Sequence, residues 1–461
     1  MIGPVCIFLV ADTENRCACA SVFFMKVMRK MLYENLGINH LGHLTFAGYD
    51  TTELAAQFGT ALMLMDESVI RNRCREYTSA MEQYLPAGSR PLYASKAFSV
   101  KRIYEIMAEE GMHIDVVSPG ELYTAVQAGY PLENAYFHGN SKTDRDIRFA
   151  MDHGIGFFIC DNPDELNAIN AEAERHGIRQ RVLLRLTPGI DPHTHEKINT
   201  GKVDSKFGAA IETGQAEELT LQTLAQENVE LCGYHCHIGS QIFDTAPFCD
   251  AAVMMLQFSA YIRDRHGYSP RLLNLGGGFG VRYTERDPRI CYTENIRIIG
   301  QLIHHVCAQL QLEPPAILME PGRSIVADSG ITLYSVASIK KIRHFKNYVA
   351  VDGGMTDNPR YTLYQSAYTV LSASRMNDPA TLFCTIAGCC CESGDLIQEN
   401  VLLPEPRRGD LVAVLTTGAY NYSMASNYNR VPRPPVVMIG PNGPYIAVRR
   451  ETYEDLLRCD L

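Results

Sequence analysis

Lys96 stands just past a short apolar run, Leu92-Tyr93-Ala94, where a buried strand would open into a site. A lysine amine that is removed from water loses its proton readily and can then hold an aldehyde cofactor as a Schiff base. Most lysines are solvated surface groups, so Lys96 alone is weak evidence for a cofactor site. The evidence becomes stronger because similar polar groups follow other apolar runs of the chain.

Polar and glycine-rich groups follow other apolar runs in the same way: His138-Gly139-Asn140, His237-Ile238-Gly239-Ser240, Gly276-Gly277-Gly278 and Glu320-Pro321-Gly322-Arg323. A glycine triplet lets backbone N–H groups approach an anion such as phosphate, although an isolated triplet is equally typical of a tight turn. It is not a dinucleotide fingerprint, because Val281 stands where the third glycine would be. Gly239-Ser240 and Gly322 offer further donors to an anion.

His235 and His237 are two residues apart and therefore face the same side of a strand. Zinc binding with Cys236 is one interpretation, but Cys236 would point to the opposite face and no third ligand is evident, so we expect no metal. Stacking on a flat aromatic cofactor suits His237 better. For His235 a hydrogen-bonded core histidine is the default.

Three charged residues complete the set: Glu320 and Arg323 follow an apolar run, and Asp115 lies within the second predicted strand. Glu320 can pair with a pyridine nitrogen and keep it protonated, or it can form an ordinary salt bridge. Arg323 offers a planar fork for a carboxylate or phosphate. Asp115 can hold the linkage between lysine and cofactor, or it can be a hydrogen-bonded turn acid.

Two later segments carry reactive groups. Cys389-Cys390-Cys391-Glu392-Ser393-Gly394-Asp395 places three thiols beside two acids, and neighbouring cysteines of an extended chain cannot all face one zinc. One reactive thiol next to Glu392 is the sharper hypothesis. The phenols of Gly418 to Tyr422 can cap a site, although packing is the commoner role for a tyrosine cluster.

The order of elements predicts two domains. Eight short strands alternate with helical stretches between Leu92 and Gly330, which is the number and size expected for a (β/α)8 barrel, with a doubly wound open sheet as the competing architecture. The predicted strands are Leu92–Ala94, Ile114–Val117, Ala135–Phe137, Phe157–Cys160, Val182–Leu186, Leu231–His237, Leu272–Leu275 and Ala316–Met319. In a barrel the loops after these strands share one rim, so the groups above would meet there.

The chain after the barrel is predicted to form a second, mostly antiparallel β domain, 331–461. Its predicted strands are Tyr348–Val351, Thr385–Ala387, Leu411–Leu415, Val436–Ile439 and Tyr445–Val448. We expect 31–60 to join this domain through a strand at Leu44–Phe46, with Asp50 and Glu53 capping a helix that leads into the barrel, 61–330.

Composition excludes several classes. The 461 residues carry a net charge of −10 without a long basic run, so nucleic acid is not an expected partner, and no apolar run reaches the length of a membrane span. The 15 cysteines show no framework spacing, which favours reduced thiols in a cytoplasmic protein. We expect residues 1–30 to be a non-native or disordered extension before a start at Met31.

The chain resembles the fold-type III pyridoxal-phosphate decarboxylases. The likeness runs from about Met31 to the C-terminus and rests on Tyr93–Ala97, Asp115–Leu122, Phe137–Lys142, His235–Gln241, Leu275–Gly278 and Glu320–Arg323. Within that family, Thr200-Gly201, Asp204–Gly208, Cys391–Asp395 and Tyr420–Asn427 resemble the diaminopimelate decarboxylases. Glu392 supports that branch, since ornithine decarboxylases usually carry Asp at this place.

The resemblance implies pyridoxal 5'-phosphate as cofactor and a role for each matching residue. Lys96 would hold the cofactor, His237 would stack on its ring and Glu320 would pair with its nitrogen, with Asp115 nearby. The residues implied around the phosphate are Ser240, Gly277, Gly278, Gly322, Arg323 and Tyr420. Arg323, Arg360 and Tyr364 resemble the substrate-carboxylate set, which Tyr420 adjoins, Cys391 resembles the proton donor, and Glu392 resembles the acid that binds the distal ammonium. In the family, the residues that match Cys391 and Glu392 reach the active site of the neighbouring subunit. The resemblance therefore implies a homodimer with shared sites.

The implied reaction is decarboxylation of meso-2,6-diaminopimelate to L-lysine and CO2. Decarboxylation of another basic amino acid, such as D-lysine, D-ornithine or carboxynorspermidine, is the nearest alternative, and Arg360 speaks against it, because such substrates lack a second carboxylate. A non-catalytic binding relative and a racemase on the same barrel are further alternatives. Retention of both Lys96 and Cys391 disfavours the first, and the Cys391-Glu392 pair disfavours the second.

Overall fold

The structure is a computed structural model that describes residues 31–190 and 206–461. The predicted extension 1–30 and the sequences Thr200-Gly201 and Asp204-Ser205 lie outside the described residues. Within the described ranges no helix is both long and apolar enough to cross a bilayer.

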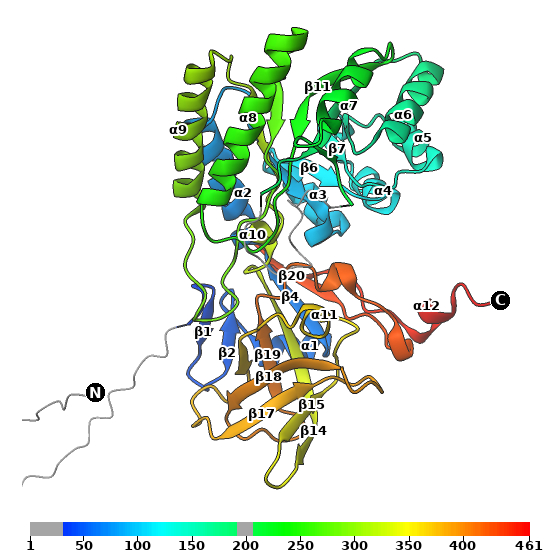
Figure 1. The fold of residues 1–461 in the computed structure, drawn as a ribbon. Helices are drawn as coiled ribbons and strands as arrows, with labels where there is room; N and C mark the ends of the chain where they lie inside the picture. The colour runs from blue at the N-terminus through cyan, green and yellow to red at the C-terminus, as the bar shows by residue number, and fades with distance from the viewer. Residues whose placement is uncertain (1–30, 191–205) are drawn as a thin grey trace, which may run out of the picture. The chain divides into compact units, whose positions relative to one another are not determined.

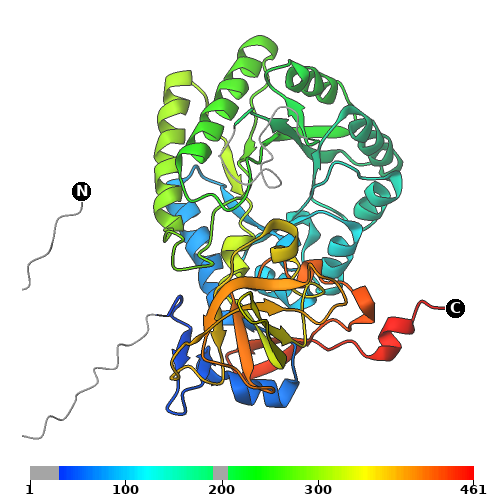
Figure 2. The ribbon, with the colours of Figure 1, turned by 60° about the horizontal axis from the view of Figure 1, so that its bottom comes forward.

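Eight parallel strands close into a barrel (Figures 1 and 2). They are β5 (Arg90–Ala94), β6 (His113–Val116), β7 (Ala135–Phe137), β8 (Phe157–Cys160), β9 (Gln180–Thr187), β11 (Val229–His235), β12 (Leu272–Asn274) and β13 (Ala316–Met319). The pairing of β8 with β9 and of β13 with β5 completes the ring. The predicted (β/α)8 barrel is therefore confirmed and the open doubly wound sheet is excluded. The two-residue strand β10 (Ala209–Ala210) adds to β9 outside the ring.

Helices form the outer layer around these strands (Figure 2). They are α2 (Glu67–Tyr84), α3 (Lys101–Glu109), α4 (Pro119–Gln127), α5 (Asp144–Asp152), α6 (Pro163–His176), α7 (Gln215–Leu224), α8 (Ala246–His266) and α9 (Tyr292–Leu310). Both ends of α6 are capped: the Asn162 side chain accepts from the Glu165 N–H, and Gly177 ends the helix at φ 64°. Gly267 ends α8 in the same way.

The second domain is a nine-stranded mixed sheet built on the long strand β14 (Gly330–Lys341). Its other strands are β4 (Leu62–Asp66), β15 (Asn347–Val351), β16 (Val370–Ser372), β17 (Leu382–Ala387), β18 (Leu396–Leu403), β19 (Leu411–Leu415), β20 (Val436–Gly440) and β21 (Gly443–Val448). Six strand pairs are antiparallel, whereas β15–β17 and β20–β4 are parallel. All five predicted strands are present, and the other four, β4, β14, β16 and β18, were not predicted. A short helix, α12 (Tyr453–Leu457), follows the sheet.

The N-terminal region differs in part from the prediction. Leu44–Phe46 is a strand, β2, but it pairs with β1 (Leu36–Ile38) and β3 (Tyr49–Asp50) in a separate small sheet. The Leu44 N–H bonds to the carbonyl of Ala373 at 2.8 Å, so this small sheet contacts the β domain without extending its sheet. Asp50 caps α1 (Thr51–Phe58) as predicted, but α1 leads into β4 of the mixed sheet. The predicted barrel interval, 61–330, thus contains one strand that pairs in the other domain.

Candidate active site

A cavity of about 560 Å³ opens at the carboxyl ends of the barrel strands. The barrel loops form most of its wall, and α11 (Arg360–Tyr364) and the 420–424 segment of the β domain supply the rest. Eleven residues singled out from the sequence line it together: Lys96, His237, Ser240, Gly277, Gly278, Glu320, Gly322, Arg323, Arg360, Tyr364 and Tyr420. The convergence expected from the order of strands is therefore observed.

Lys96 lies in a short 3-10 turn, Ser95–Ala97, immediately after β5. Burial by itself would lower the pKa of its ammonium, but the charges of Asp115, Tyr420 and Glu320 outweigh burial and raise that pKa. The expectation that desolvation frees the amine is therefore wrong for the protein chain alone. In the chain by itself, Lys96 is a cation held among acidic groups.

Asp115 lies in β6, next to Ala94 of β5, and is fully buried. Burial raises the pKa of its carboxyl group. Within the described part of the chain neither of its carboxylate oxygens has a hydrogen-bond partner. A buried carboxyl group without donors is costly, which indicates that a group outside the chain meets it.

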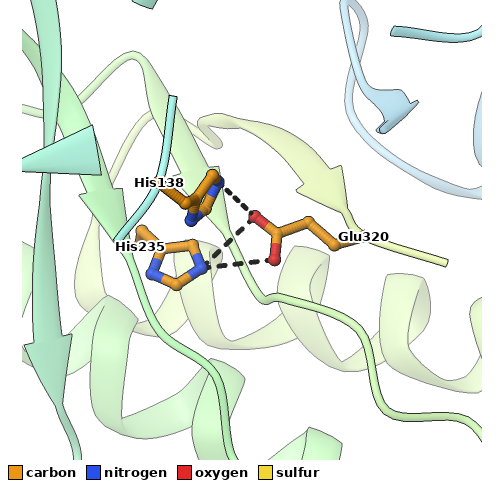
Figure 3. Close-up of side chains that lie close together, drawn as sticks. All are labelled: His138, His235 and Glu320. Carbon is orange, nitrogen blue, oxygen red and sulfur yellow. Dashed lines mark hydrogen bonds and ion pairs between the residues drawn. The ribbon is translucent and has the colours of Figure 1, made fainter. Parts of the chain in front are cut away.

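Glu320, at the end of β13, is surrounded by nitrogen donors (Figure 3). Its Oε1 accepts from Asn274 Nδ2 at 2.7 Å and lies 3.0 Å from His138 Nε2 and 3.3 Å from His235 Nε2. Burial opposes its ionisation, but the two histidines hold the pKa of Glu320 well below its usual range. Burial lowers the pKa of His235 to about 4, so this ring is neutral at pH 7 and donates through Nε2–H. Glu320 is thus a buried acceptor whose ionised form is favoured by its neighbours.

The sequence prediction missed the partners of Glu320. His138 was noted at the rim but was not assigned a role, and Asn274, the last residue of β12, was not noted. Asn274 also accepts from the Gly276 N–H at 2.8 Å and so ties the glycine triplet to Glu320. The sequence does offer one feature that could have identified Asn274: it is a single polar residue at the end of an apolar strand. The side chains of His138, His235 and Glu320 offer atoms within 4.8 Å of one another, and the absence of a metal there stays a prediction.

His237 follows β11 and accepts from the Gly277 N–H through Nδ1 at 3.3 Å. Burial lowers the pKa of this ring well below its usual value, so it is neutral. A flat, neutral ring fixed at one edge against the cavity suits stacking on an aromatic cofactor. His235, in contrast, bonds to Glu320 through Nε2 and has no hydrogen-bond partner for Nδ1 among the described residues. Only one of the two hydrogen bonds expected of a core histidine is therefore present.

Glycine at 277 and 278 is required by close backbone approach. A Cβ at Gly277 would lie 2.0 Å from the carbonyl oxygen of Glu320, and one at Gly278 would lie 2.5 Å from that of Gly239. Gly278 also has φ +125°, a conformation that L side chains rarely adopt. The triplet is therefore both a tight turn and an open backbone surface on the cavity, so the two interpretations left open by the sequence apply together.

Three guanidinium groups face the same cavity, and two of them, those of Arg323 and Arg360, are buried. Arg323 donates to the Tyr283 hydroxyl at 2.6 Å and to Ser240 Oγ at 3.0 Å. Arg360 lies over the rings of Tyr364 and Tyr420, 5.0 and 5.4 Å from their centroids. The third, Arg185 of β9, was not predicted. In the ranges 31–190 and 206–461 none of the three pairs with a carboxylate, so the cavity is suited to anionic ligands.

Cys391 and Glu392 are not brought to this cavity. They lie on an exposed loop after β17, where the Cys391 N–H donates to Asn429 Oδ1 at 2.7 Å. Glu392 Oε1 accepts from the Gly394 N–H at 3.1 Å. Within one chain, the predicted proton donor and the predicted ammonium-binding acid are therefore separate from the other predicted residues.

These features suit pyridoxal phosphate. For a phosphate the cavity offers guanidinium groups that pair with no carboxylate in the described part of the chain, together with a glycine-lined backbone surface. For a pyridinium ring it offers an ionised buried carboxylate and a neutral flat ring. Asp115, whose carboxylate oxygens have no hydrogen-bond partner among the described residues, pairs in β6 with Ala94, two residues before Lys96.

Comparisons with known proteins identify the class. Residues 67–327 match the family described as pyridoxal-dependent decarboxylase, pyridoxal binding domain, and this match begins directly after β4. The chain belongs to the pyridoxal-dependent decarboxylases, whose cofactor is pyridoxal 5'-phosphate.

The relatives narrow the class further. Diaminopimelate decarboxylase of Bacillus subtilis (strain 168) is 45% identical over 92% of this chain and 96% of its own length. That of Staphylococcus aureus (strain COL) is 40% identical over 92% of this chain and 98% of its own. The crystal structure of diaminopimelate decarboxylase from M. jannaschii in co-complex with L-lysine has a TM-score of 0.85 at 33% identity, covering 93% of this chain and 98% of the other. Within the pyridoxal-dependent decarboxylases, the chain belongs to the diaminopimelate decarboxylase group.

Proposed function

We propose that this protein decarboxylates meso-2,6-diaminopimelate to L-lysine and CO2, the last step of lysine biosynthesis, with pyridoxal 5'-phosphate as cofactor. The observation that carries this proposal is a cavity with buried arginines that have no acidic partner among the described residues, in a chain related over more than nine tenths of its length to diaminopimelate decarboxylases. Because the cavity holds more than one guanidinium group, it can bind both the cofactor phosphate and a second substrate carboxylate.

Lys96 would hold the cofactor, and Asp115 would stabilise the positive charge at that linkage. His237 would lie against the ring and Glu320 would hold a proton on the ring nitrogen. Ser240, Gly277, Gly278, Gly322, Arg323 and Tyr420 would surround the phosphate. When bound, pyridoxal phosphate supplies an aldehyde that captures the substrate amine and a protonated ring that takes up an electron pair.

The remaining task of the chain is to choose the carboxylate that leaves. Arg323, Arg360 and Tyr364 can hold the distal carboxylate of a diaminodicarboxylic acid by forked hydrogen bonds. A substrate without that carboxylate would leave Arg360 buried and unpaired, which is unfavourable. This requirement favours diaminopimelate over ornithine-like substrates. A lysine/ornithine decarboxylase from Vibrio vulnificus has a similar fold, with a TM-score of 0.70 at 25% identity.

Loss of CO2 leaves an electron pair on Cα, and a proton must return to that carbon. We assign this proton to the Cys391 thiol and assign recognition of the distal ammonium to Glu392. Both residues lie on an exposed loop outside the cavity of their own chain, so we infer a homodimer in which this loop completes the partner's site. Every cysteine among the described residues is unpaired, which supports a cytoplasmic location.

The direct test is release of CO2 from meso-diaminopimelate, assayed with and without added pyridoxal phosphate, with D-lysine, D-ornithine and carboxynorspermidine as competing substrates. Equal amounts of CO2 and L-lysine from diaminopimelate are expected. Turnover of a substrate that lacks the second carboxylate, without turnover of diaminopimelate, would contradict the proposal.

The shared site has its own test. Alone, Lys96→Ala is expected to be inactive, and Cys391→Ala is expected to keep only about 1% of wild-type activity or less. Mixing them under exchange of subunits should restore roughly a quarter of wild-type activity, because half of the random dimers contain one intact site of two. No recovery in dimers shown to have exchanged would place both residues in one chain's site.

A further inference from the structure

The Asp395 carboxylate joins two loops that bear proposed site residues. Asp395 is only 2% exposed, and it forms no ion pair within the ranges that the structure describes. Its Oδ2 accepts from the Cys390 N–H at 2.7 Å, and its Oδ1 accepts from the Met355 N–H at 2.6 Å. The first loop, 388–395, carries Cys391, and the second, 353–360, ends at Arg360.

The surroundings of Asp395 are shaped to receive its carboxylate. A Cβ at Gly388 would lie 2.2 Å from both carboxylate oxygens, and one at Gly354 would lie 2.5 Å from Oδ1. The Asp395 carbonyl also accepts from the Gly388 N–H at 2.9 Å, which closes loop 388–395 on itself. The two glycines therefore leave room for one acid between the loops.

Further bonds tie the same two loops together. The Cys389 N–H donates to the Gly353 carbonyl at 2.9 Å, and Thr362 Oγ1 of α11 donates to the Gly394 carbonyl at 2.9 Å. Asp395 is nevertheless the only side chain that accepts from both loops among the described residues, and its bonds are charge-assisted.

We propose that Asp395 is a positioning residue that fixes the thiol-bearing loop relative to the loop of Arg360. This inference rests on the proposed function, in which Cys391 returns the proton and Arg360 binds the substrate carboxylate. Arg360 serves the cavity of its own chain and Cys391 serves the partner's, so Asp395 mechanically links the two sites of the dimer. It touches no reacting atom and acts through the two backbone N–H groups.

The test is Asp395→Asn in the holoenzyme. The amide keeps the volume of the side chain but turns an NH2 group toward one of the two N–H donors, so one loop is released. We expect kcat to fall about tenfold to a hundredfold, the worth of a lost charge-assisted hydrogen bond, with an unchanged absorbance spectrum of the bound cofactor. Hydrogen exchange should become at least tenfold faster in peptides that contain Met355 or Cys390 and stay unchanged in the barrel strands. Asp378→Asn, which alters an exposed acid of the same domain that pairs with Arg375, is the matched control and should behave as wild type.

A double-mutant cycle separates this role from general destabilisation. If Asp395 acts through the thiol, Asp395→Asn should change the residual kcat of Cys391→Ala by less than twofold. Full additivity of the two changes, or unchanged hydrogen exchange in both loops, would overturn the positioning role. Wild-type kcat in Cys391→Ala itself would instead refute the proposed function of the thiol. In that case the hydrogen-exchange rates would still show whether Asp395 fixes the two loops.

Discussion

Asn274 offers a sharp perturbation of the site because its amide lies between an acceptor, the Glu320 carboxylate, and a donor, the Gly276 N–H. Its Nδ2 donates to Glu320 Oε1 at 2.7 Å, and its Oδ1 accepts from the Gly276 N–H at 2.8 Å. Asn274→Asp keeps the shape and the bond to Gly276 but replaces the donor with an oxygen that faces the Glu320 carboxylate. Two charges at this distance repel by about 6 kcal/mol at an effective dielectric constant near 20. The pair therefore retains one shared proton into the neutral range.

This shared proton gives the variant a distinctive pH dependence. While the proton is present, the introduced carboxyl group donates to Glu320 as the amide does, and activity should remain near wild type. As pH rises and the proton leaves, the repulsion should distort the rim and lower kcat by 10-fold or more relative to wild type. The assay is the ratio of variant to wild-type kcat between pH 6 and 9, with Asn347→Asp on the surface of the β domain as control. A ratio that stays constant across this range would refute the assignment of Asn274 as a donor to an ionised Glu320.

Three further outcomes are expected. Cys391→Ala should lower kcat by roughly 10²–10⁴-fold, the usual contribution of a positioned acid. Cys389→Ala removes a neighbouring exposed thiol and should leave kcat unchanged. Equal effects of the two substitutions would contradict the assignment of Cys391 as the proton donor. Arg360→Lys should raise KM for diaminopimelate about tenfold through loss of the forked hydrogen bonds, with unchanged affinity for pyridoxal phosphate; a weakened cofactor instead would move Arg360 to the phosphate. Burial, together with the charges of Arg90 and Arg181, lowers the pKa of His113 to about 4. Below pH 6.5 the unfolded chain therefore binds a proton at this histidine that the native state does not bind. The free energy of unfolding should then fall by up to about 3 kcal/mol as the pH drops from about 6.5 to 4. His113→Phe should therefore show a smaller difference between urea midpoints at pH 5 and pH 7.5, and an equal difference would contradict the burial effect.

The barrel could be predicted because each of its strands is buried on both faces and reads as a short apolar run. The mixed sheet was less predictable. Strand β14 begins at Gly330, directly after the last barrel loop, and its second half is half-exposed, so it carries no continuous apolar run. Strand β4 precedes the barrel in sequence but pairs with β14 and β20, a long-range choice that local pattern does not encode.

The candidate site shows the same division. Residues at the ends of strands, such as Lys96 and Glu320, were predictable because barrel topology brings strand ends together. The neighbours that set their charge were not. Asn274 and His235 lie 46 and 85 residues from Glu320, and only the closed ring of strands makes them adjacent. The raised pKa of Lys96 likewise depends on Asp115 and Glu320, whose distances from the amine are tertiary facts.

The central claim is that pyridoxal phosphate is attached to Lys96, and one measurement addresses it directly. The holoenzyme is reduced with borohydride, which makes the attachment permanent, and digested, and the modified peptide is identified by mass spectrometry. The account predicts one pyridoxyl group per chain on Lys96, with loss of the cofactor's visible absorbance in Lys96→Ala. A pyridoxyl group on another lysine, or an unchanged spectrum in Lys96→Ala, would contradict it.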